Sequence, residues 1–215
     1  MPTRDLSHPL DDDVTVYPGD PAVERAPAAT HEADGYRVTE IRMGSHAGTH
    51  VDAPSHTEPD GGTLDAFDAA RFAFDARLVD CSDKRAREPI RPGDLPDDPD
   101  ADLLAIRTGW ADEWGSDAYY DHPYLSEAAA RACAENGCCV GVDALSVDPS
   151  PSARGTERDG EPAGVPAHHT LLGSERLIVE NLTGLSGLPD RFELRAYPLP
   201  LPDADGAPVR AVAVW

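Results

Sequence analysis

Residues 126–143, SEAAARACAENGCCVGVD, join a helix directly to a buried strand, and this junction decides the class of fold. Ser126 can accept a hydrogen bond from a free amide at the start of the helix, and Glu127 favours the positive end of the helix dipole. Gly137 suits the left-handed residue at which a helix ends. The apolar run from Cys138 to Val142 follows at once. This alternation of helix and strand predicts a mixed sheet rather than a purely antiparallel one.

Short strands are predicted along most of the remaining chain, between turns marked by 21 prolines and 18 glycines. A minor helix is predicted around Leu64–Ala70. The 215 residues suit one domain, spanning 1–215, with a sheet-dominated, mixed α/β fold and few helices. The predicted strands, each rich in β-branched, aromatic or aliphatic residues, are Val14–Tyr17, Tyr36–Met43, Phe72–Cys81, Leu103–Thr108, Cys138–Val142, Leu177–Glu180, Phe192–Tyr197 and Val209–Trp215.

The chain is strongly acidic, with a formal net charge of −22. This charge repels nucleic acid and anionic lipid, so neither is expected as a partner. Lys84 is the only lysine, and an acidic surface depleted of lysine resembles proteins of salt-loving organisms. The acidic residues repel one another, and molar salt screens this repulsion because it shortens the Debye length to about 3 Å. We therefore expect halophilic behaviour, with weaker folding at low salt. Without a bilayer-spanning apolar run or a signal-peptide core, the chain is expected in the cytoplasm.

Three other features are structural or have a structural alternative. The four cysteines have no C-x-x-C spacing and are expected to be small buried hydrophobes: Cys81, Cys133, Cys138 and Cys139. Residues 148–167 predict a loop that is either a tolerated surface insertion or a mobile cover leading into His168. Trp110, in RTGW, either forms an aromatic wall near a site or packs under the sheet.

Residues 45–56, SHAGTHVDAPSH, contain three of the eight histidines, His46, His50 and His56. An eleven-residue window of this composition would contain roughly 0.4 histidine, so a metal site or an acid/base site explains the cluster better than chance. Gly48 and Pro54 disfavour a helix, and a tight loop is predicted here instead.

The chemistry of the candidate ligands narrows the kind of site. In extended geometry, the side chains of His50 and Asp52 point to the same side of the chain. Nitrogen and oxygen ligands without thiolate suit Zn, Mn or Fe(II) rather than a structural zinc. Downstream, Glu180 ends an apolar strand, where a buried carboxylate is costly unless it meets a cation. Glu180 is therefore either a strand-end residue facing water or a metal ligand together with His168. His169, beside His168, is either a ring that supports a ligand or a ring on the surface.

The motifs HAGTHVDAPSH, AIRTGW, GVDALSVDP and HHTLLGSERLIVENL resemble, in this order, the metal-dependent cyclase family that includes bacterial kynurenine formamidase. The resemblance implies a strongly curved mixed sheet and a homodimer or homotetramer. It also implies two divalent ions per chain, Zn or Mn. His46, His50 and Asp52 would bind the first ion, Asp52 would bridge to a second that His168 completes, and Glu180 would contact both.

The implied reaction is hydrolysis of an amide carbonyl in N-formylkynurenine, a step of tryptophan breakdown, or in a related aryl or cyclic amide such as isatin. Metal-activated water would attack the carbonyl, with His56 as the free general acid/base. Tyr17 lies where the formamidases commonly carry tryptophan. It would contact the substrate ring or, alternatively, only flank the turn at Pro18.

Two alternatives from other classes stay open. His50, Asp52 and His168 imitate the facial triad of a non-haem Fe(II) oxygenase, although that triad leaves the other candidate ligands unused. A non-catalytic metal-binding protein would bind metal but tolerate the loss of His56. Serine hydrolase chemistry is poorly supported because the chain has no G-x-S-x-G.

Overall fold

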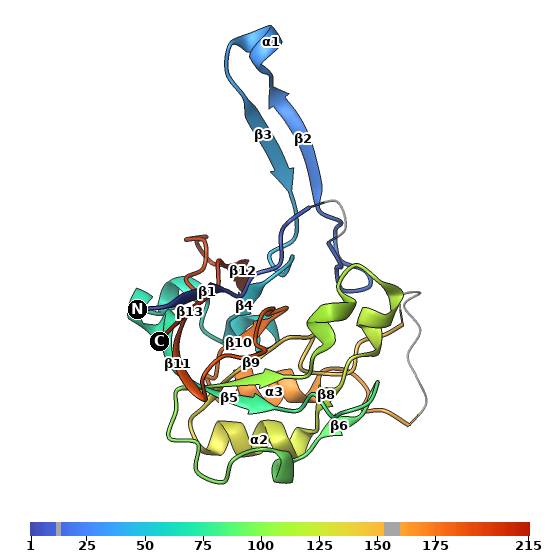
Figure 1. Ribbon diagram of the computed structural model, residues 1–215, viewed down its shortest axis with the longest axis vertical. Helices are drawn as coiled ribbons and strands as arrows, with labels where there is room; N and C mark the ends of the chain where they lie inside the picture. Colours follow the sequence, from blue (N-terminus) through green and yellow to red (C-terminus); the bar gives the residue numbers. More distant parts are fainter. Residues whose placement is uncertain (12–13, 153–159) are drawn as a thin grey trace.

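The computed structural model describes residues 1–11, 14–152 and 160–215. Its centre is a strongly curled sheet of nine strands in the order β1-β13-β11-β5-β7-β9-β10-β4-β12 (Figure 1). The neighbours from β5 to β10 run parallel, and the other neighbours run antiparallel. The prediction of a mixed, curved sheet is therefore confirmed. The strands are β1 Thr3–Asp5, β4 His50–Asp52, β5 Ala73–Asp80, β7 Leu103–Arg107, β9 Cys139–Val142, β10 Ile178–Glu180, β11 Arg191–Arg195, β12 Gly206–Pro208 and β13 Val212–Val214.

The sheet is covered on both faces, which explains its short, continuously apolar central strands. Along β7, Leu103 and Ala105 belong to the core on one face, together with Phe74 and Val51. The alternate residue Ile106 belongs to a second core on the other face, beneath the helices. A strand buried on both faces needs no polar alternation, and β7 shows none.

The helices are few, as predicted, and they are short. They are α1 His31–Asp34, α2 Glu127–Glu135 and α3 Pro166–Leu172. Ser126 caps α2 by accepting a hydrogen bond from Ala129 N at 3.2 Å, and Gly137 has the expected positive φ of 75°. Helices α2 and α3 lie on the same face of the sheet (Figure 1). The 3-10 turns are η1 Pro54–His56, η2 Leu64–Ala66, η3 Ala69–Phe72, η4 Pro92–Asp94, η5 Trp110–Glu113 and η6 Asp117–Asp121.

Several local predictions were wrong. Val14–Tyr17 forms no strand, and the carbonyl of Val16 instead accepts a hydrogen bond from the Tyr120 hydroxyl at 3.1 Å. The predicted tight loop contains strand β4, which pairs with β10 and β12. The predicted minor helix is the pair of 3-10 turns η2 and η3, and helix α3 was not predicted. A three-residue strand such as β4 is too short for a periodic signal, and its pairing is entirely non-local.

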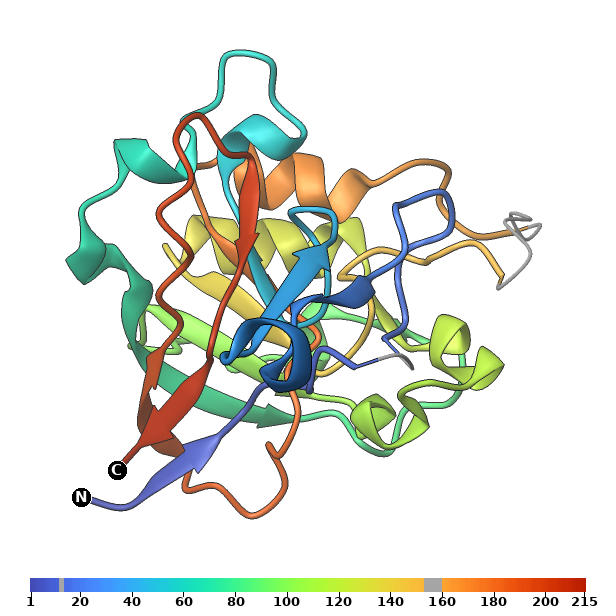
Figure 2. The same cartoon turned by 90° about the horizontal axis from the view of Figure 1, so that it is seen from above.

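A two-stranded arm, β2 Glu24–Ala29 and β3 Val38–Arg42, projects from the body and carries α1 at its tip (Figure 1). Figure 2 looks down this arm. The predicted strand Tyr36–Met43 is β3 of the arm. A second small sheet pairs β6 Pro89–Ile90 with β8 Tyr124–Leu125.

The four cysteines are all free and buried, as expected of small hydrophobes. The predicted loop 148–167 lies partly outside the described residues, at 153–159, and its last residues begin α3. Among the described helices, none has the length and apolar character needed to cross a membrane.

Candidate metal centre

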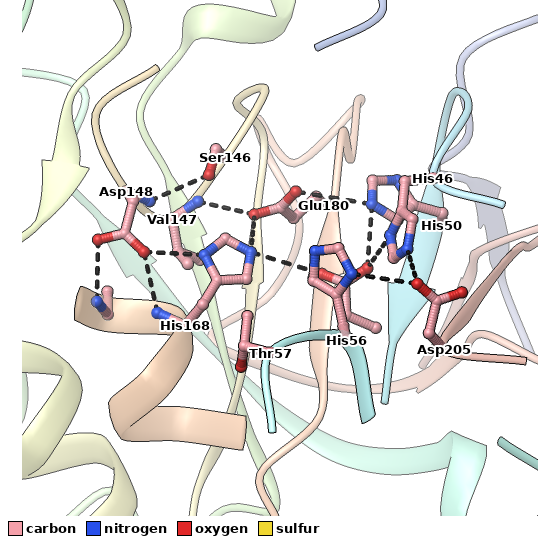
Figure 3. A network of polar contacts seen from close by, with 12 residues as sticks. His46, His50, His56, Thr57, Ser146, Val147, Asp148, His168, Glu180 and Asp205 are labelled. Atoms are coloured by element: carbon pink, nitrogen blue, oxygen red, sulfur yellow. Dashed lines mark hydrogen bonds and ion pairs between the residues drawn. The ribbon is translucent and has the colours of Figure 1, made fainter. Parts of the chain in front are cut away.

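Strands β4 and β10 bring the two halves of the candidate site together. They pair antiparallel, with His50 opposite Glu180 and Asp52 opposite Ile178. Because side chains alternate along a strand and directly opposed residues share a face, the side chains of His50, Asp52 and Glu180 lie on one side of the sheet. All three are buried. Residues 128 or more positions apart in the chain thus meet in one cluster (Figure 3).

The His50 ring is oriented by the backbone. Its Nδ1 donates a hydrogen bond to the Gly48 carbonyl at 2.8 Å. The same carbonyl accepts a bond from the Asn181 amide at 3.0 Å. The His50 Nε2 atom therefore turns to the cluster, 3.1 Å from Asp52 Oδ1 and 3.6 Å from Glu180 Oε2.

His168 is oriented in the same way by a carboxylate. Asp148 accepts hydrogen bonds from the backbone N–H groups of Ala167 and His168 at 2.9 Å, and from His168 Nδ1 at 2.8 Å. Asp148 thereby both caps the start of α3 and fixes the orientation of the His168 ring. The remaining atom, His168 Nε2, lies 3.4 Å from Glu180 Oε1 and 3.8 Å from Asp52 Oδ2. Such outer partners set the tautomer in which Nε2 can act as a ligand.

His46 lies between two carboxylates. Its Nδ1 is 2.7 Å from Asp52 Oδ1, and its Nε2 is 3.0 Å from Asp205 Oδ2. Gly206, on the neighbouring strand β12, makes room for the ring, because a Cβ at that position would lie 2.9 Å from His46 Nδ1. The position of His46 therefore depends on a chain segment about 160 residues further on.

Burial and mutual charge govern the electrostatics. Burial and the negative charge of Asp52 together raise the pKa of Glu180 to about 7, against the opposing charge of His168. Burial also opposes the charge of Asp52, but His50 and His46 outweigh it and hold its pKa well below the usual range.

For two of the histidines, burial and the neighbouring carboxylates shift the pKa in opposite directions. Burial alone would lower the pKa of His168, yet the hydrogen bond to Asp148 and the charge of Glu180 raise it to about 9. The pKa of His46 is likewise raised to about 10, because the bonds to Asp52 and Asp205 outweigh burial. The buried carboxylates thus stabilise positive charge on the groups that lie among them.

The stabilisation of positive charge by the buried carboxylates and the chemistry of the donor set both fit a divalent cation. Within the described part of the chain, Asp52 Oδ2 is a buried oxygen without a hydrogen-bond partner. Imidazole nitrogens and carboxylate oxygens are ligands that Zn and Mn accept. Three groups have candidate ligand atoms within 4.8 Å of one another: His46, His50 and Asp52; Asp52, His168 and Glu180; and His46, His56 and Asp205. Asp52 is shared by the first two groups, as a bridging ligand would be.

His56 lies beside this cluster rather than within its buried part. It ends the 3-10 turn η1, which follows β4, and its side chain is 31% exposed. Its Nδ1 lies 3.3 Å from Asp205 Oδ2, and its ring centre lies 4.0 Å from that of His46. Burial lowers the pKa of His56, and the nearby His46 and His168 lower it further against the charge of Asp52.

A cavity of about 250 Å³ opens onto these groups. Its walls include His46, His50, His56, His168 and Glu180, together with an apolar side formed by Tyr17, Leu145 and Val165. The cavity offers a polar floor and a flat apolar wall to a small molecule.

Two other aromatic candidates lie elsewhere. Trp110 packs against the core beneath the helices and does not line this cavity. His169 is exposed and contacts Glu58 at 2.8 Å, so it is a surface ring.

Two carboxylates of the network were not predicted as site residues, Asp148 and Asp205. Asp148 stands in a motif that carries the family resemblance, but nothing in its spacing points to His168. Asp205 lies in an ordinary turn-forming stretch, PDADGAP. Both act on histidines of other chain segments, which no local pattern encodes.

The geometry does not favour the oxygenase alternative. A facial triad of His50, Asp52 and His168 would need open positions for other ligands. Glu180 and His46 instead crowd the same cluster, with Glu180 within 3.6 Å of both imidazoles of the triad.

Comparison with known proteins finds consistent similarity over the whole chain. Residues 4–149 match the Cyclase family model. Kynurenine formamidase of Salinibacter ruber is 34% identical over 222 residues, covering 99% of this chain and 97% of the relative. Isatin hydrolase A from Labrenzia aggregata, bound to benzyl benzoate, has a TM-score of 0.84 at 24% identity and covers 99% of this chain and 93% of its own. A potential metal-dependent hydrolase with cyclase activity has a TM-score of 0.76 at 26% identity, with coverage of 99% and 96%.

Proposed function

The chain belongs to the Cyclase family, and from that premise we propose that it is an arylformamidase, a metal-dependent hydrolase that cleaves the amide C–N bond of N-formylkynurenine or a related aryl amide. The observation that carries the proposal is the arrangement around Asp52. Asp52 lies between the imidazoles of His50 and His168, whose other nitrogens are already engaged, and its Oδ2 is buried without a hydrogen-bond partner in the described chain. Full-length similarity to kynurenine formamidases supports the reaction class.

We assign the divalent metal to the two groups that share Asp52. His46, His50 and Asp52 would hold one ion, and Asp52, His168 and Glu180 a second. Zn and Mn both suit this donor set. Bound there, a divalent ion would lower the pKa of water and polarise the substrate carbonyl.

The chain's own residues would do the rest. His56 Nδ1 faces Asp205, which leaves Nε2 to exchange a proton in the cavity. At Nε2, His56 would take a proton from the attacking water and return it to the leaving nitrogen, a role typically worth about 10²–10⁴-fold in rate. An imidazole titrates near neutrality and so suits both transfers.

The apolar wall of the cavity would hold the aryl group. Tyr17 offers a flat face opposite the polar floor, with Leu145 and Val165 beside it. Tyr17 has a hydroxyl and a smaller ring system than the tryptophan that formamidases commonly carry there. We therefore expect this chain to differ from those formamidases in its preference among aryl amides. Isatin-like cyclic amides are the next substrates to test.

We further propose a cytoplasmic, salt-adapted enzyme with one domain over residues 1–215, assembled as a homodimer or homotetramer. The acidic charge of −22 motivates the salt adaptation. All assays are therefore designed in molar KCl.

The test is hydrolysis of N-formylkynurenine by the purified protein loaded with Zn or Mn, with His56→Ala beside it. We expect turnover that chelator abolishes and that falls at least about 10²-fold in the variant while its metal content stays unchanged. His169→Ala, which removes an exposed histidine outside the cavity, is the matched control. Full activity in His56→Ala would refute the assigned role. Absence of turnover in the metal-loaded wild type would reject this substrate.

A further inference from the structure

Arg87, between β5 and β6, is a largely buried arginine whose guanidinium joins three other segments of the chain. Its side chain is only 9% exposed. Its Nη1 group donates hydrogen bonds to the carbonyls of Tyr120 at 2.8 Å and Ser150 at 2.9 Å. Its Nε donates to Glu161 Oε1 at 2.6 Å, and its Nη2 donates to Glu161 Oε2. A planar guanidinium that holds a carboxylate at two points fixes its direction as well as its distance.

The backbone of Arg87 gives an independent sign that this side chain is needed. Its φ is 61°, in the left-handed region that residues other than glycine and asparagine rarely adopt. Its N–H group donates a hydrogen bond to the Asp121 carbonyl at 2.9 Å, which holds the turn in this conformation. Glycine would adopt the same backbone at lower cost. The guanidinium, rather than the backbone, therefore explains an arginine at this position.

Two of the segments that Arg87 binds are the two ends of loop 148–167. Ser150 follows Asp148 by two residues, and Glu161 precedes His168 by seven. Asp148 in turn accepts the hydrogen bond from His168 Nδ1 that orients the ring (Figure 3). Arg87 thus binds the loop on both sides, and the residues of the candidate site lie just beyond each point of attachment.

We propose that Arg87 is a positioning residue for His168. By bridging Ser150 and Glu161, it holds the two ends of the loop where Asp148 and His168 can meet. Its own side-chain hydrogen bonds go to none of the candidate ligands, so it acts through the loop alone. This inference rests on the proposed function, because that function takes His168 as a metal ligand.

The two halves of the candidate site differ in how they are held. Strand β4 pairs with β10 and β12, so the sheet holds His50 and Glu180 in place. His168 instead lies on α3, a helix of seven residues that follows the loop. Without Arg87, the contact between Asp148 and His168 closes a chain of about 20 residues, and with Arg87 it closes about 10. Because the probability of closure falls with the 3/2 power of length, the bridge favours the contact about threefold.

Burial lets this bridge persist in salt. The side chains of Arg87 and Glu161 are 9% and 15% exposed. By contrast, the ion pair of Arg131 with Glu127 on α2 is 62% and 56% exposed. Exposed pairs contribute little and are screened by salt, whereas buried pairs are screened much less. The bridge should therefore hold the loop in the molar KCl in which the assays are designed.

The test is titration of Zn against a chromophoric chelator in molar KCl, with the full chain as wild type, Arg87→Asn, His168→Ala and the double variant. Asparagine accepts the left-handed backbone, so Arg87→Asn removes the side chain without straining the turn. We expect Arg87→Asn to weaken, at least about threefold, the Zn-binding step that His168→Ala weakens or abolishes. In the His168→Ala background it should cause no further loss, because the ring that it positions is gone.

Arg107→Asn is the matched control. Arg107 donates hydrogen bonds to both carboxylate oxygens of Asp80 at 3.0 and 2.9 Å and to Ser82 Oγ at 2.9 Å, and it is not among the walls of the cavity. It should match the wild type. If circular dichroism shows that Arg87→Asn does not fold, because the Glu161 charge is left unpaired, Glu161→Gln takes its place. This variant loses the charge but keeps the bonds to Tyr120 and Ser150, and it should weaken the same step.

Three outcomes would overturn the proposal. One is wild-type Zn affinity in the folded variant while His168→Ala weakens binding, and the metal assignment would then stand without a role for Arg87. The second is an equal loss in the His168→Ala background, which would mean that Arg87 acts on the fold in general. The third is wild-type affinity in His168→Ala itself, and the ligand assignment of the proposed function would then fail as well.

Discussion

Replacing Asp148 with asparagine should weaken metal binding by about 10- to 100-fold while the fold is retained. Asp148 accepts three hydrogen bonds, from Ala167 N, His168 N and His168 Nδ1, at 2.8 to 2.9 Å. An asparagine keeps one acceptor oxygen, and its NH₂ group must face at least one of these donors. If that donor is the imidazole, the proton moves to Nε2, the atom that faces Asp52 and Glu180.

The magnitude follows from what the substitution leaves unpaired. A buried donor without an acceptor costs about 1–3 kcal/mol of stability. A 10- to 100-fold loss of affinity corresponds to about 1.4–2.7 kcal/mol. Titration of Zn against a chromophoric chelator measures the affinity, and urea unfolding of the metal-free protein measures the stability.

Asp143→Asn is the matched control. Asp143 is also buried, and it accepts bonds from Thr108 N and Thr108 Oγ1 at 2.6 Å and from Gly109 N at 2.9 Å. It contacts none of the candidate ligands through these bonds. The control should lose comparable stability and keep its metal affinity. Unchanged affinity in Asp148→Asn, or an equal loss in Asp143→Asn, would refute the orienting role of Asp148.

Three further predictions concern packing, pH and salt. Gly206→Ala puts a methyl group 2.9 Å from His46 Nδ1. It should therefore weaken Zn binding about tenfold or more in the same titration, and wild-type affinity would contradict this. His122 is buried, and burial lowers its pKa from 6.5 to about 4. The unfolded chain thus gains the proton first as the pH falls, and stability is lost between pH 6.5 and about 4. In urea unfolding at pH 7 and pH 4.5, His122→Gln should reduce that loss by about 2 kcal/mol, whereas an equal loss in both proteins would argue against it. Finally, with a net charge of −22, the melting temperature should rise from dilute buffer to molar KCl, and a constant value would count against salt adaptation.

Local chemistry was enough to predict the class of fold. The helix from Glu127 was predicted because its cap, Ser126, and its exit, Gly137, are adjacent to it in the chain. Seven of the eight predicted strands correspond to strands of the structure, because runs of β-branched, aromatic or aliphatic residues bounded by turn formers are local signals. The exception, Val14–Tyr17, has the right composition but finds no neighbouring strand.

The sequence by itself also determined the candidate ligands, since His46, His50 and Asp52 lie within seven residues and carry a recognisable motif. Only the tertiary structure decided how they are held. Strand β4 forms because β10 and β12 pair with it, and Asp148, Asp205 and Gly206 act on histidines far away in the chain. Hydrogen bonds and steric limits of this kind depend on distance in space, and residue order alone carries no record of which distant carboxylate will meet which ring.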